Sequence, residues 1–477
     1  MDIIRPAREE IREMNVPQLA VRGRLVRPEG VARGTILISE GRIAGFASAS
    51  ANVRADAVYD YGDSLVLSGA IDTHVHFREP GFTQKEDFAS GTMAAAAGGV
   101  TTVVDMPNTE PWVTSASIFR EKRRTIERKA CVDFGLSGGL TSEGHLRVEE
   151  LTAAGALSVE TFLADAPEET VLDDDYRISK SLVECAHLRQ VMGVYCDSQS
   201  FWSQAAKNSR ARGEVTMSAF HAAKPSQSES LGAARMCILN KDAEATLVLR
   251  QISTASALNQ ARFHRRQNPS IHVETTPHYL LLSSKNESNS GFSLKISPPL
   301  RSERDRLALW RGIDDGTVEI ISSDHSPHTL LEKERDDVWG VPSGFPSIET
   351  SLVLMLDQVK RGRLSIRRMS ELMSKNPAKV LGLSPRKGTL TTGAQADLVV
   401  ADFAEHTIRA ERLHSKCGWT PYEGRKVRAR LRCTFLAGRM ICRDGEILES
   451  RSGRFVSRTI PRGARHVTKT NRANDSA

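Results

Sequence analysis

The chain has 477 residues and a formal net charge of +7, a length that favours one large α/β barrel with a small second domain over a single simple globule. Its composition, 40% hydrophobic and 26% charged residues, is that of a soluble protein, and no apolar run approaches the roughly 20 residues that cross a membrane. The first residues, MDIIRPAREE, are charged and mixed in sign, unlike a secretion signal, so we expect a cytoplasmic protein without a membrane partner.

The cysteines and the basic residues exclude two further classes. Seven cysteines without a CxxC pair argue against a disulfide framework or a zinc ribbon, and we expect buried thiols. Much of the positive charge lies in segment 451–477, which we predict to be a mobile basic tail. No aromatic-and-basic recognition motif accompanies it, so we expect no nucleic-acid partner.

The predicted elements begin with short β-rich segments at 19–24, 34–40 and 42–47, after an N-terminal extension over residues 1–18. Glycine-containing turns separate these segments, which indicates part of a small sheet. From about residue 68 apolar strands alternate with helical stretches, the pattern of βα units. Eight such strands are predicted, at 68–77, 100–106, 131–137, 156–163, 191–197, 245–253, 270–276 and 317–324.

Eight is the number of strands that closes a (β/α)₈ barrel. Helical segments near 348–360 and 366–381 follow, and then strand-like pieces at 396–401, 427–436 and 439–442. We expect these last pieces to complete the sheet that the N-terminus begins. The predicted architecture is therefore an α/β fold, a (β/α)₈ barrel over 68–383 with a small β-sandwich domain built from 19–67 and 384–450.

Two histidines lie on the first predicted barrel strand. The alternation of a strand places His74, His76 and Arg78 on one face. Imidazole nitrogen is a good ligand for zinc and related metals, and a catalytic site needs few protein ligands so that water can occupy an open position. A lone HxH pattern is weak, because neighbouring histidines are often structural.

Asp324 ends the eighth predicted strand, directly after Ser323 and before the histidines at 325 and 328. Barrel enzymes place catalytic groups at the carboxyl ends of their strands. A carboxylate beside a metal and its water can bind the ion, take the water's proton and pass it to a leaving nitrogen. We therefore predict that Asp324 is a metal ligand and the general base.

The segment Gly69-Ala70-Ile71-Asp72-Thr73-His74-Val75-His76-Phe77-Arg78-Glu79-Pro80-Gly81 resembles the signature of dihydroorotases in the amidohydrolase superfamily. Similar agreement continues at 97–102, 105–109, 276–280, 297–301, 323–328 and 376–378. The resemblance implies a metal-dependent barrel with a β-sandwich that opens a cyclic amide ring, and a homo-oligomer. By motif match, Arg78, Asn108 and His328 stand where dihydroorotases bind the substrate's carboxylate, and their chemistry suits an anion.

Three positions depart from that pattern. Glu160 stands where the family usually has a bridging carboxylated lysine, and both metal ligation and simple pairing with Arg or His remain open for it. Tyr195 and Gln251 stand at the two usual histidine ligand positions of the fifth and sixth strands, and neither a phenol nor an amide binds zinc as imidazole does. We therefore expect one Zn²⁺ or another divalent ion, held by His74, His76, Asp324 and Glu160.

Three functions stay open at this point. The first is a dihydroorotase-like hydrolase of a small cyclic amide that bears a carboxylate. The second is a hydantoinase- or allantoinase-type hydrolase of another cyclic ureide, because Ser297 and Tyr279 resemble that branch. The third is a non-catalytic, structural or regulatory dihydroorotase-like subunit, which the three replaced ligands suggest.

Overall fold

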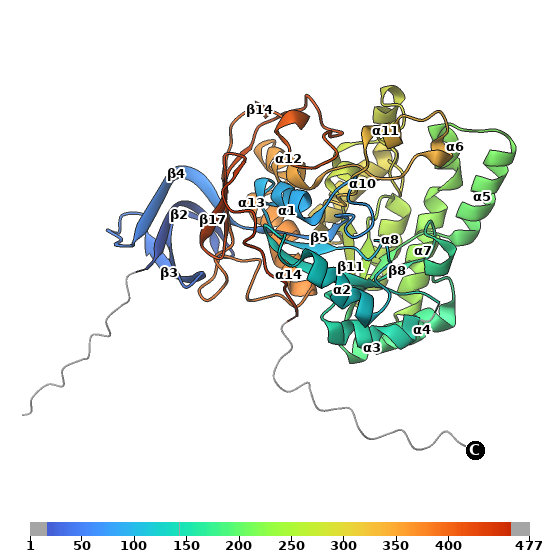
Figure 1. The fold of residues 1–477 in the computed structure, drawn as a ribbon, viewed down its shortest axis with the longest axis horizontal. Helices are drawn as coiled ribbons and strands as arrows, with labels where there is room; N and C mark the ends of the chain where they lie inside the picture. Colours follow the sequence, from blue (N-terminus) through green and yellow to red (C-terminus); the bar gives the residue numbers. More distant parts are fainter. Residues whose placement is uncertain (1–16, 143, 459–477) are drawn as a thin grey trace, which may run out of the picture.

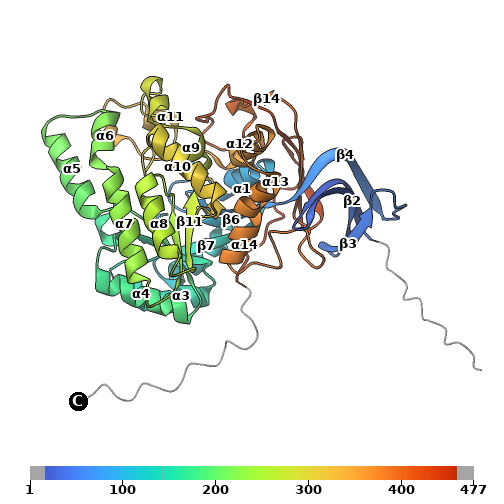
Figure 2. The ribbon, with the colours of Figure 1, turned by 180° about the vertical axis from the view of Figure 1, so that it is seen from behind.

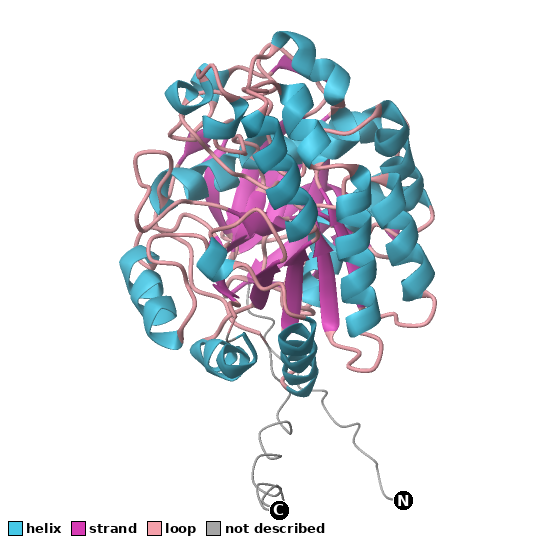
Figure 3. Ribbon diagram, turned by 90° about the vertical axis from the view of Figure 1, so that its right-hand side faces the viewer, coloured by secondary structure: helices cyan, strands magenta, loops and turns pink. Residues whose placement is uncertain are grey.

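A computed structural model describes residues 17–142 and 144–458. Its centre is a barrel of eight strands, all paired in parallel, with helices on the outside (Figures 1 and 3). The strands are β5 (Ala70–Val75), β6 (Val100–Asp105), β7 (Asp133–Gly139), β8 (Ser158–Phe162), β9 (Val191–Tyr195), β10 (Thr246–Arg250), β11 (Ile271–Thr275) and β12 (Ile320–Ile321). A parallel bridge between Val75 and His325 joins the last strand to the first, which confirms the predicted barrel.

Several barrel helices begin where a polar side chain caps the first turn. Asp87 accepts the amide of Ser90 in a capping box at the start of α1, and the side chains of Ser115 and Asp174 each accept a first-turn amide at the start of α2 and α4. The helices are α1 (Phe88–Ala97), α2 (Ala116–Ile126), α3 (Gly144–Ala154), α4 (Asp175–His187), α5 (Gln199–Ala211), α6 (Met217–Ala223), α7 (Ser226–Leu239), α8 (Ala255–Arg265), α9 (Pro277–Leu281), α10 (Glu303–Asp314), α11 (Leu330–Lys333), α12 (Ile348–Lys360), α13 (Ile366–Ser370) and α14 (Asn376–Val380). Short helical turns are η1 (Glu168–Thr170), η2 (Ser284–Asn289), η3 (Val338–Gly340), η4 (Glu371–Lys375) and η5 (Ala410–Arg412).

A second sheet is built from both ends of the described chain and lies to one side of the barrel (Figure 2). Its eight strands run in the order β18-β17-β16-β13-β4-β1-β2-β3. They are β1 (Leu19–Arg27), β2 (Gly30–Ser39), β3 (Arg42–Ser48), β4 (Ala57–Ser68), β13 (Leu398–Asp402), β16 (Arg430–Leu436), β17 (Arg439–Arg443) and β18 (Glu446–Ile447), and β14 (His406–Thr407) pairs with β15 (Lys426–Val427) apart from them. The terminal segments therefore share one sheet, with its own core around Val21, Ile36 and Phe435.

The end of the described chain returns to the barrel. Phe455 forms a parallel bridge with Phe134 of β7 and packs its ring 5.7 Å from the Phe134 ring and 6.2 Å from that of Phe119. Residues 451–458 of the segment predicted as a mobile tail are thus packed, while 459–477, like 1–16 of the N-terminal extension, lie outside the described residues. No helix among the described residues is long and apolar enough to span a membrane.

Candidate functional site

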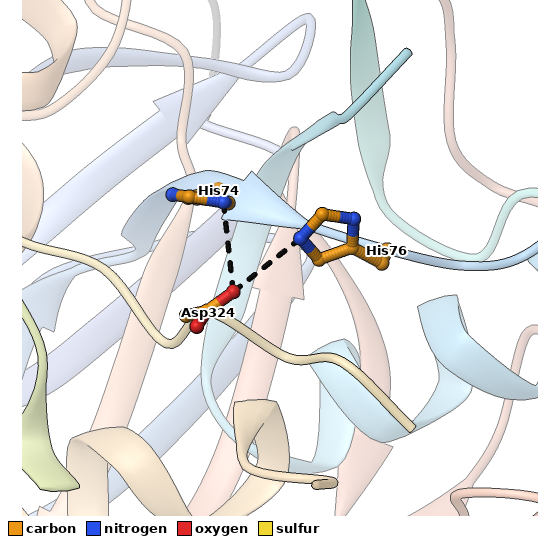
Figure 4. A group of neighbouring side chains, drawn as sticks. All are labelled: His74, His76 and Asp324. Carbon is orange, nitrogen blue, oxygen red and sulfur yellow. Dashed lines mark ion pairs between the residues drawn. The ribbon is translucent and has the colours of Figure 1, made fainter. Parts of the chain in front are cut away.

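His74, His76 and Asp324 meet at the carboxyl ends of the barrel strands (Figure 4). The Nε2 atoms of His74 and His76 lie 3.5 and 3.3 Å from Asp324 Oδ1, and all three side chains are buried. The carboxylate of Asp72 accepts the amides of His74 (3.2 Å) and Ser323 (3.1 Å), which ties β5 to the segment that carries Asp324. The structure thus brings together the three residues that the motifs single out.

An acceptor behind each histidine fixes its orientation. His74 donates Nδ1–H to Glu274 Oε1 at 3.0 Å, and His76 donates Nδ1–H to Asn108 Oδ1 at 2.7 Å. A proton held at Nδ1 leaves the Nε2 lone pair free for a metal, the usual arrangement of metal-binding histidines. Sequence reasoning missed Glu274; an acidic residue near the carboxyl end of the predicted barrel strand at 270–276 was the available signal.

Asp324 is held in its charged form by the two histidines. Burial alone would raise the pKa of Asp324, but the charges and the hydrogen bond of His74 and His76 lower it below its ordinary value. Burial would likewise lower the pKa of His74, yet Asp324 and Glu274 raise it overall. His76, without a second carboxylate, has its pKa lowered by burial. The cluster is therefore an anionic oxygen flanked by two imidazoles.

Glu160 is bound by an arginine. Its Oε1 and Oε2 accept from Arg250 Nη2 at 2.7 Å and Nε at 3.2 Å, and Ser158 Oγ donates to Oε1 at 2.6 Å. Arg250 Nη1 also donates to Glu274 Oε2 at 2.6 Å. The group of possible metal ligands found among the described residues contains His74, His76 and Asp324 without Glu160. Of the two interpretations left open by the sequence, the pairing with arginine is the one observed, and sequence reasoning did not find Arg250.

The two other replaced positions have different partners. Gln251 donates its amide Nε2–H to Asp324 Oδ2, so it fixes the plane of that carboxylate. The Tyr195 hydroxyl lies 3.0 Å from Lys224 Nζ and 2.9 Å from Ser297 Oγ. Both residues line the same cavity as His74 and His76. Gln251 therefore orients the carboxylate of Asp324, and Tyr195 belongs to a neighbouring polar network.

That cavity has a volume of about 470 Å³, and Arg78, Asn108 and His328 line it as well. Arg78 Nη2 donates to Ser326 Oγ at 2.6 Å and lies 3.0 Å from His328 Nε2. Burial lowers the pKa of Arg78 to about 10, which leaves it charged at neutral pH. Burial and the Arg78 charge hold the pKa of His328 well below its ordinary value, so this imidazole is neutral.

Four of the nine non-glycine residues with a positive φ angle in the described part of the chain line the cavity. Arg78, Asp165, Gln251 and Asp324 line it, and their φ angles are 62°, 57°, 53° and 47°. Non-glycine residues in this left-handed region lose roughly 1 kcal/mol or more each. Such conformations persist where the surrounding structure enforces them, typically at functional sites. The strain supports this cavity as the functional one.

His278 is a further polar side chain of the site region that sequence reasoning did not assign. It is buried, and neither ring nitrogen has a hydrogen-bond partner in the described part of the chain. Burial lowers its pKa to about 4, although the nearby Asp324 opposes the shift. Buried imidazole nitrogens without partners are rare in proteins. The unpartnered nitrogens of His278, together with the two imidazoles and the carboxylate that surround one point, fit a site for a divalent ion such as zinc.

Comparisons with known proteins identify the family of this chain. A family model described as "Dihydro-orotase-like" matches residues 63–257, and one described as "Amidohydrolase family" matches residues 205–441. A dihydroorotase of Halobacterium salinarum is 36% identical over 84% of this chain and 91% of its own, and an allantoinase of Rubrobacter xylanophilus is 34% identical over 84% and 89%.

A solved structure is also similar to this chain, in this case by its fold. The L-hydantoinase (dihydropyrimidinase) from Arthrobacter aurescens superposes with a TM-score of 0.89 at 29% identity, over 92% of this chain and 100% of that one. The matches extend over the barrel and the terminal sheet alike. The chain therefore belongs to the amidohydrolase family, among the proteins related to dihydroorotases, hydantoinases and allantoinases.

Proposed function

We propose that this protein is a hydrolase that opens a cyclic amide ring with the help of a single divalent ion, Zn²⁺ in the simplest case. His74, His76 and Asp324 would hold the ion. The observation that carries the proposal is the convergence of His74 Nε2 and His76 Nε2 on Asp324 Oδ1, at 3.5 and 3.3 Å, in the wall of a cavity large enough for a small ligand. Glu160 is left out of the ligand set because Arg250 binds it.

A divalent ion in this position lowers the pKa of water and polarises a carbonyl oxygen. The residues around it supply the rest of the chemistry. Asp324 is the general base that takes a proton from water and passes it to the ring nitrogen that leaves. Gln251 keeps the carboxylate plane fixed during that transfer, since it donates to Oδ2 while Oδ1 faces the histidines.

Arg78, Asn108 and His328 are proposed to hold the ring substituent. A buried guanidinium next to a neutral imidazole favours a carboxylate over a neutral group. Held there, the substrate would present its scissile amide to the ion, and the fixed orientation itself accelerates the reaction. A dihydroorotate-like ring meets these requirements.

Hydrolysis of a hydantoin or allantoin ring is the second candidate. Ser297 lines the cavity, and the fold similarity to the L-hydantoinase structure favours this class of ring. Tyr279, the other residue that resembles this branch, donates its hydroxyl to Pro298 O at 2.6 Å and is buried, so we assign it a structural role.

The test combines metal analysis with a substrate panel. We expect close to one divalent ion per chain, and ring opening of dihydroorotate, hydantoin or allantoin that a chelator abolishes. His74→Ala should lose both the ion and at least about 100-fold in kcat/KM, whereas His264→Ala, on the outer helix α8, should keep both. A protein that binds no ion, or His74→Ala with unchanged turnover, would contradict the proposal; a bound ion without ring opening would favour the non-catalytic subunit.

A further inference from the structure

Part of the cavity wall is built from aromatic rings that have cations close to their faces. Trp202 of α5, Phe220 of α6 and Trp339 of η3 line this part, with ring centroids 6.0 to 6.4 Å apart. Lys295 Nζ lies 4.7 Å from the Phe220 ring centre, and the Arg210 guanidinium lies 5.2 Å from that of Trp339. Both of these cations line the cavity themselves.

The acids that line the cavity do not neutralise these two cations. Asp165 is paired with the buried Lys224 at 2.9 Å and accepts from Ser297, and Asp324 belongs to the metal site. Lys295 Nζ donates to two main-chain carbonyls, those of Val338 (2.7 Å) and Val341. Within residues 17–142 and 144–458, no carboxylate oxygen lies within 4.0 Å of the Lys295 or Arg210 nitrogens.

Holding these two cations in the cavity costs free energy when no anion is bound between them. The pKa of Lys295 is lowered to about 8, mainly by burial and also by the charges of Lys224 and Arg210, while the charges of Asp165 and Asp337 oppose the shift. A cation in this setting gains more from an anionic partner than a solvated one does, because water screens the pair less. The main-chain carbonyl oxygens that accept from Lys295 carry only partial negative charges, so they do not replace an anionic partner.

We propose that the space between Lys295 and Arg210 is a second anion subsite of this cavity, separate from the one proposed at Arg78, and that it binds the carboxylate at the end of a longer substituent on the cyclic amide ring. This inference rests on the proposed function, since it names the substrate class of the same cavity. The cavity volume of about 470 Å³ suits a ligand larger than a bare ring. The aromatic faces would cover the substituent, and the two cations would bind its end.

Two hydantoins that differ only in charge test this. One carries a 2-carboxyethyl side chain on C5 of the ring, and the other carries the matching 2-carbamoylethyl side chain on the same atom. We expect the protein to prefer the carboxylate by about tenfold or more in kcat/KM. Arg210→Gln and Lys295→Gln should each reduce that preference several-fold. Lys207→Gln, an exposed cation of the same helix α5 that does not line the cavity, should retain it.

Lys295→Gln removes the hydrogen bonds of Lys295 Nζ to the segment around Val338, so its effect on the preference needs an independent variant. Arg210→Gln is that variant. Arg210 is exposed at the cavity rim and has no hydrogen bond within the described residues that the substitution would break. Equal kcat/KM for the two hydantoins, or a preference that Arg210→Gln leaves unchanged, would overturn the subsite.

Binding separates this inference from the proposed function. Calorimetry with the full chain, its metal removed by a chelator so that the rings stay closed, should show tighter binding of the carboxylate than of the amide, and loss of the difference in Arg210→Gln. That result without any ring opening by the metal-loaded protein would remove the proposed hydrolysis and keep the subsite. Ring opening of both compounds with no difference in binding would keep the hydrolysis and remove the subsite.

Discussion

His74 and His76 have the same role in the site but different partners behind them. A carboxylate, Glu274, accepts from His74, whereas the neutral amide of Asn108 accepts from His76. A carboxylate makes the imidazole a stronger donor of electrons to a metal, so the two proposed ligands would not be equivalent. Glu274 in turn is held by Thr73 Oγ1 and by Arg250 Nη1, each at 2.6 Å.

Replacing Glu274 by glutamine is predicted to weaken metal binding. The amide keeps the shape of the side chain but removes the charge that supports His74, so we expect the affinity for Zn²⁺ to fall about 10- to 100-fold. Competition with a chromophoric chelator measures this. Glu319→Gln is the matched control, because Glu319 accepts from His272 at 2.7 Å outside the cavity. Equal loss in both variants would refute the assigned role.

Glu274 also predicts a dependence of stability on pH. Burial would raise its pKa, but Arg250 and His74 lower it far below the ordinary value of 4.5. A depressed carboxyl pKa stabilises the folded state above 4.5, and this contribution is lost progressively as the pH falls below that value. In the chelated protein, the free energy of unfolding from urea titrations should therefore fall below pH 4.5, with a shallower slope in Glu274→Gln. Parallel slopes would contradict the assignment.

The motif residues of the site could be predicted from the sequence because the pattern that identifies each of them lies within one short segment. The period of a strand places His74 and His76 on one face, and Asp324 follows a separate strand end. The contacts that Glu274 and Arg250 make could not be predicted in this way, since their partners lie on other strands. Whether Glu160 faces a metal or a guanidinium depends on which side chains adjacent strands bring together, which the sequence alone left open.

At the scale of elements, β9 makes room for the buried ion pair. Gly193 of β9 pairs with Glu160 in the β8–β9 register. A Cβ atom built on Gly193 would lie 2.0 Å from Glu160 Oε2 and 2.6 Å from Arg250 Nε. The absence of a side chain at this position is therefore what allows the carboxylate and the guanidinium to meet.

Gly193→Ala should destabilise the protein markedly. The new methyl group has to displace a buried ion pair, and we expect a loss of about 3 kcal/mol in the free energy of unfolding. Urea denaturation measures it. Gly45→Ala in β3 is the control, because a Cβ there meets nothing within 4 Å and should leave stability nearly unchanged. A loss at residue 193 no larger than at residue 45 would count against this packing.

Most elements of the barrel could be predicted from their apolar runs, and α12 has the predicted limits, 348–360. β4 was missed, because its first eight residues, AVYDYGDS, are largely exposed and include Gly62 and two aspartates. Its last four residues are buried and were assigned in part to the first barrel strand. The division into a barrel over 68–383 and a domain of 19–67 and 384–450 stays a prediction.

On the scale of the whole molecule, the chain end reinforces the barrel. Phe455 contacts Phe134 and Phe119, and the Arg123 guanidinium lies 4.0 Å from its ring centre. Gly453 also donates its amide to Ala130 O at 2.9 Å. These contacts connect the segment after the terminal sheet to α2 and β7, so the C-terminal end of the described chain stabilises the barrel.

Phe455→Ala should therefore lower the stability of the entire barrel. Loss of a packed ring predicts a decrease of about 2 kcal/mol, below the value for a fully buried phenylalanine because Phe455 is only partly buried. Thermal unfolding should register it as a lower Tm. Phe263→Ala, whose side chain is 59% exposed on α8, should leave the Tm close to that of the wild type. Equal Tm values for the two variants would disprove the contribution.

The bridge that Arg250 makes between Glu160 and Glu274 has a consequence for redesign. Installing histidines at positions 195 and 251 would supply imidazoles, but the carboxylate of Glu160 would remain committed to a guanidinium at 2.7 Å. A second cation would have to compete with a charge that is covalently tethered and always present. Conversion to a two-ion centre therefore requires removal of Arg250 together with both replacements, and any one change made alone should be neutral or harmful.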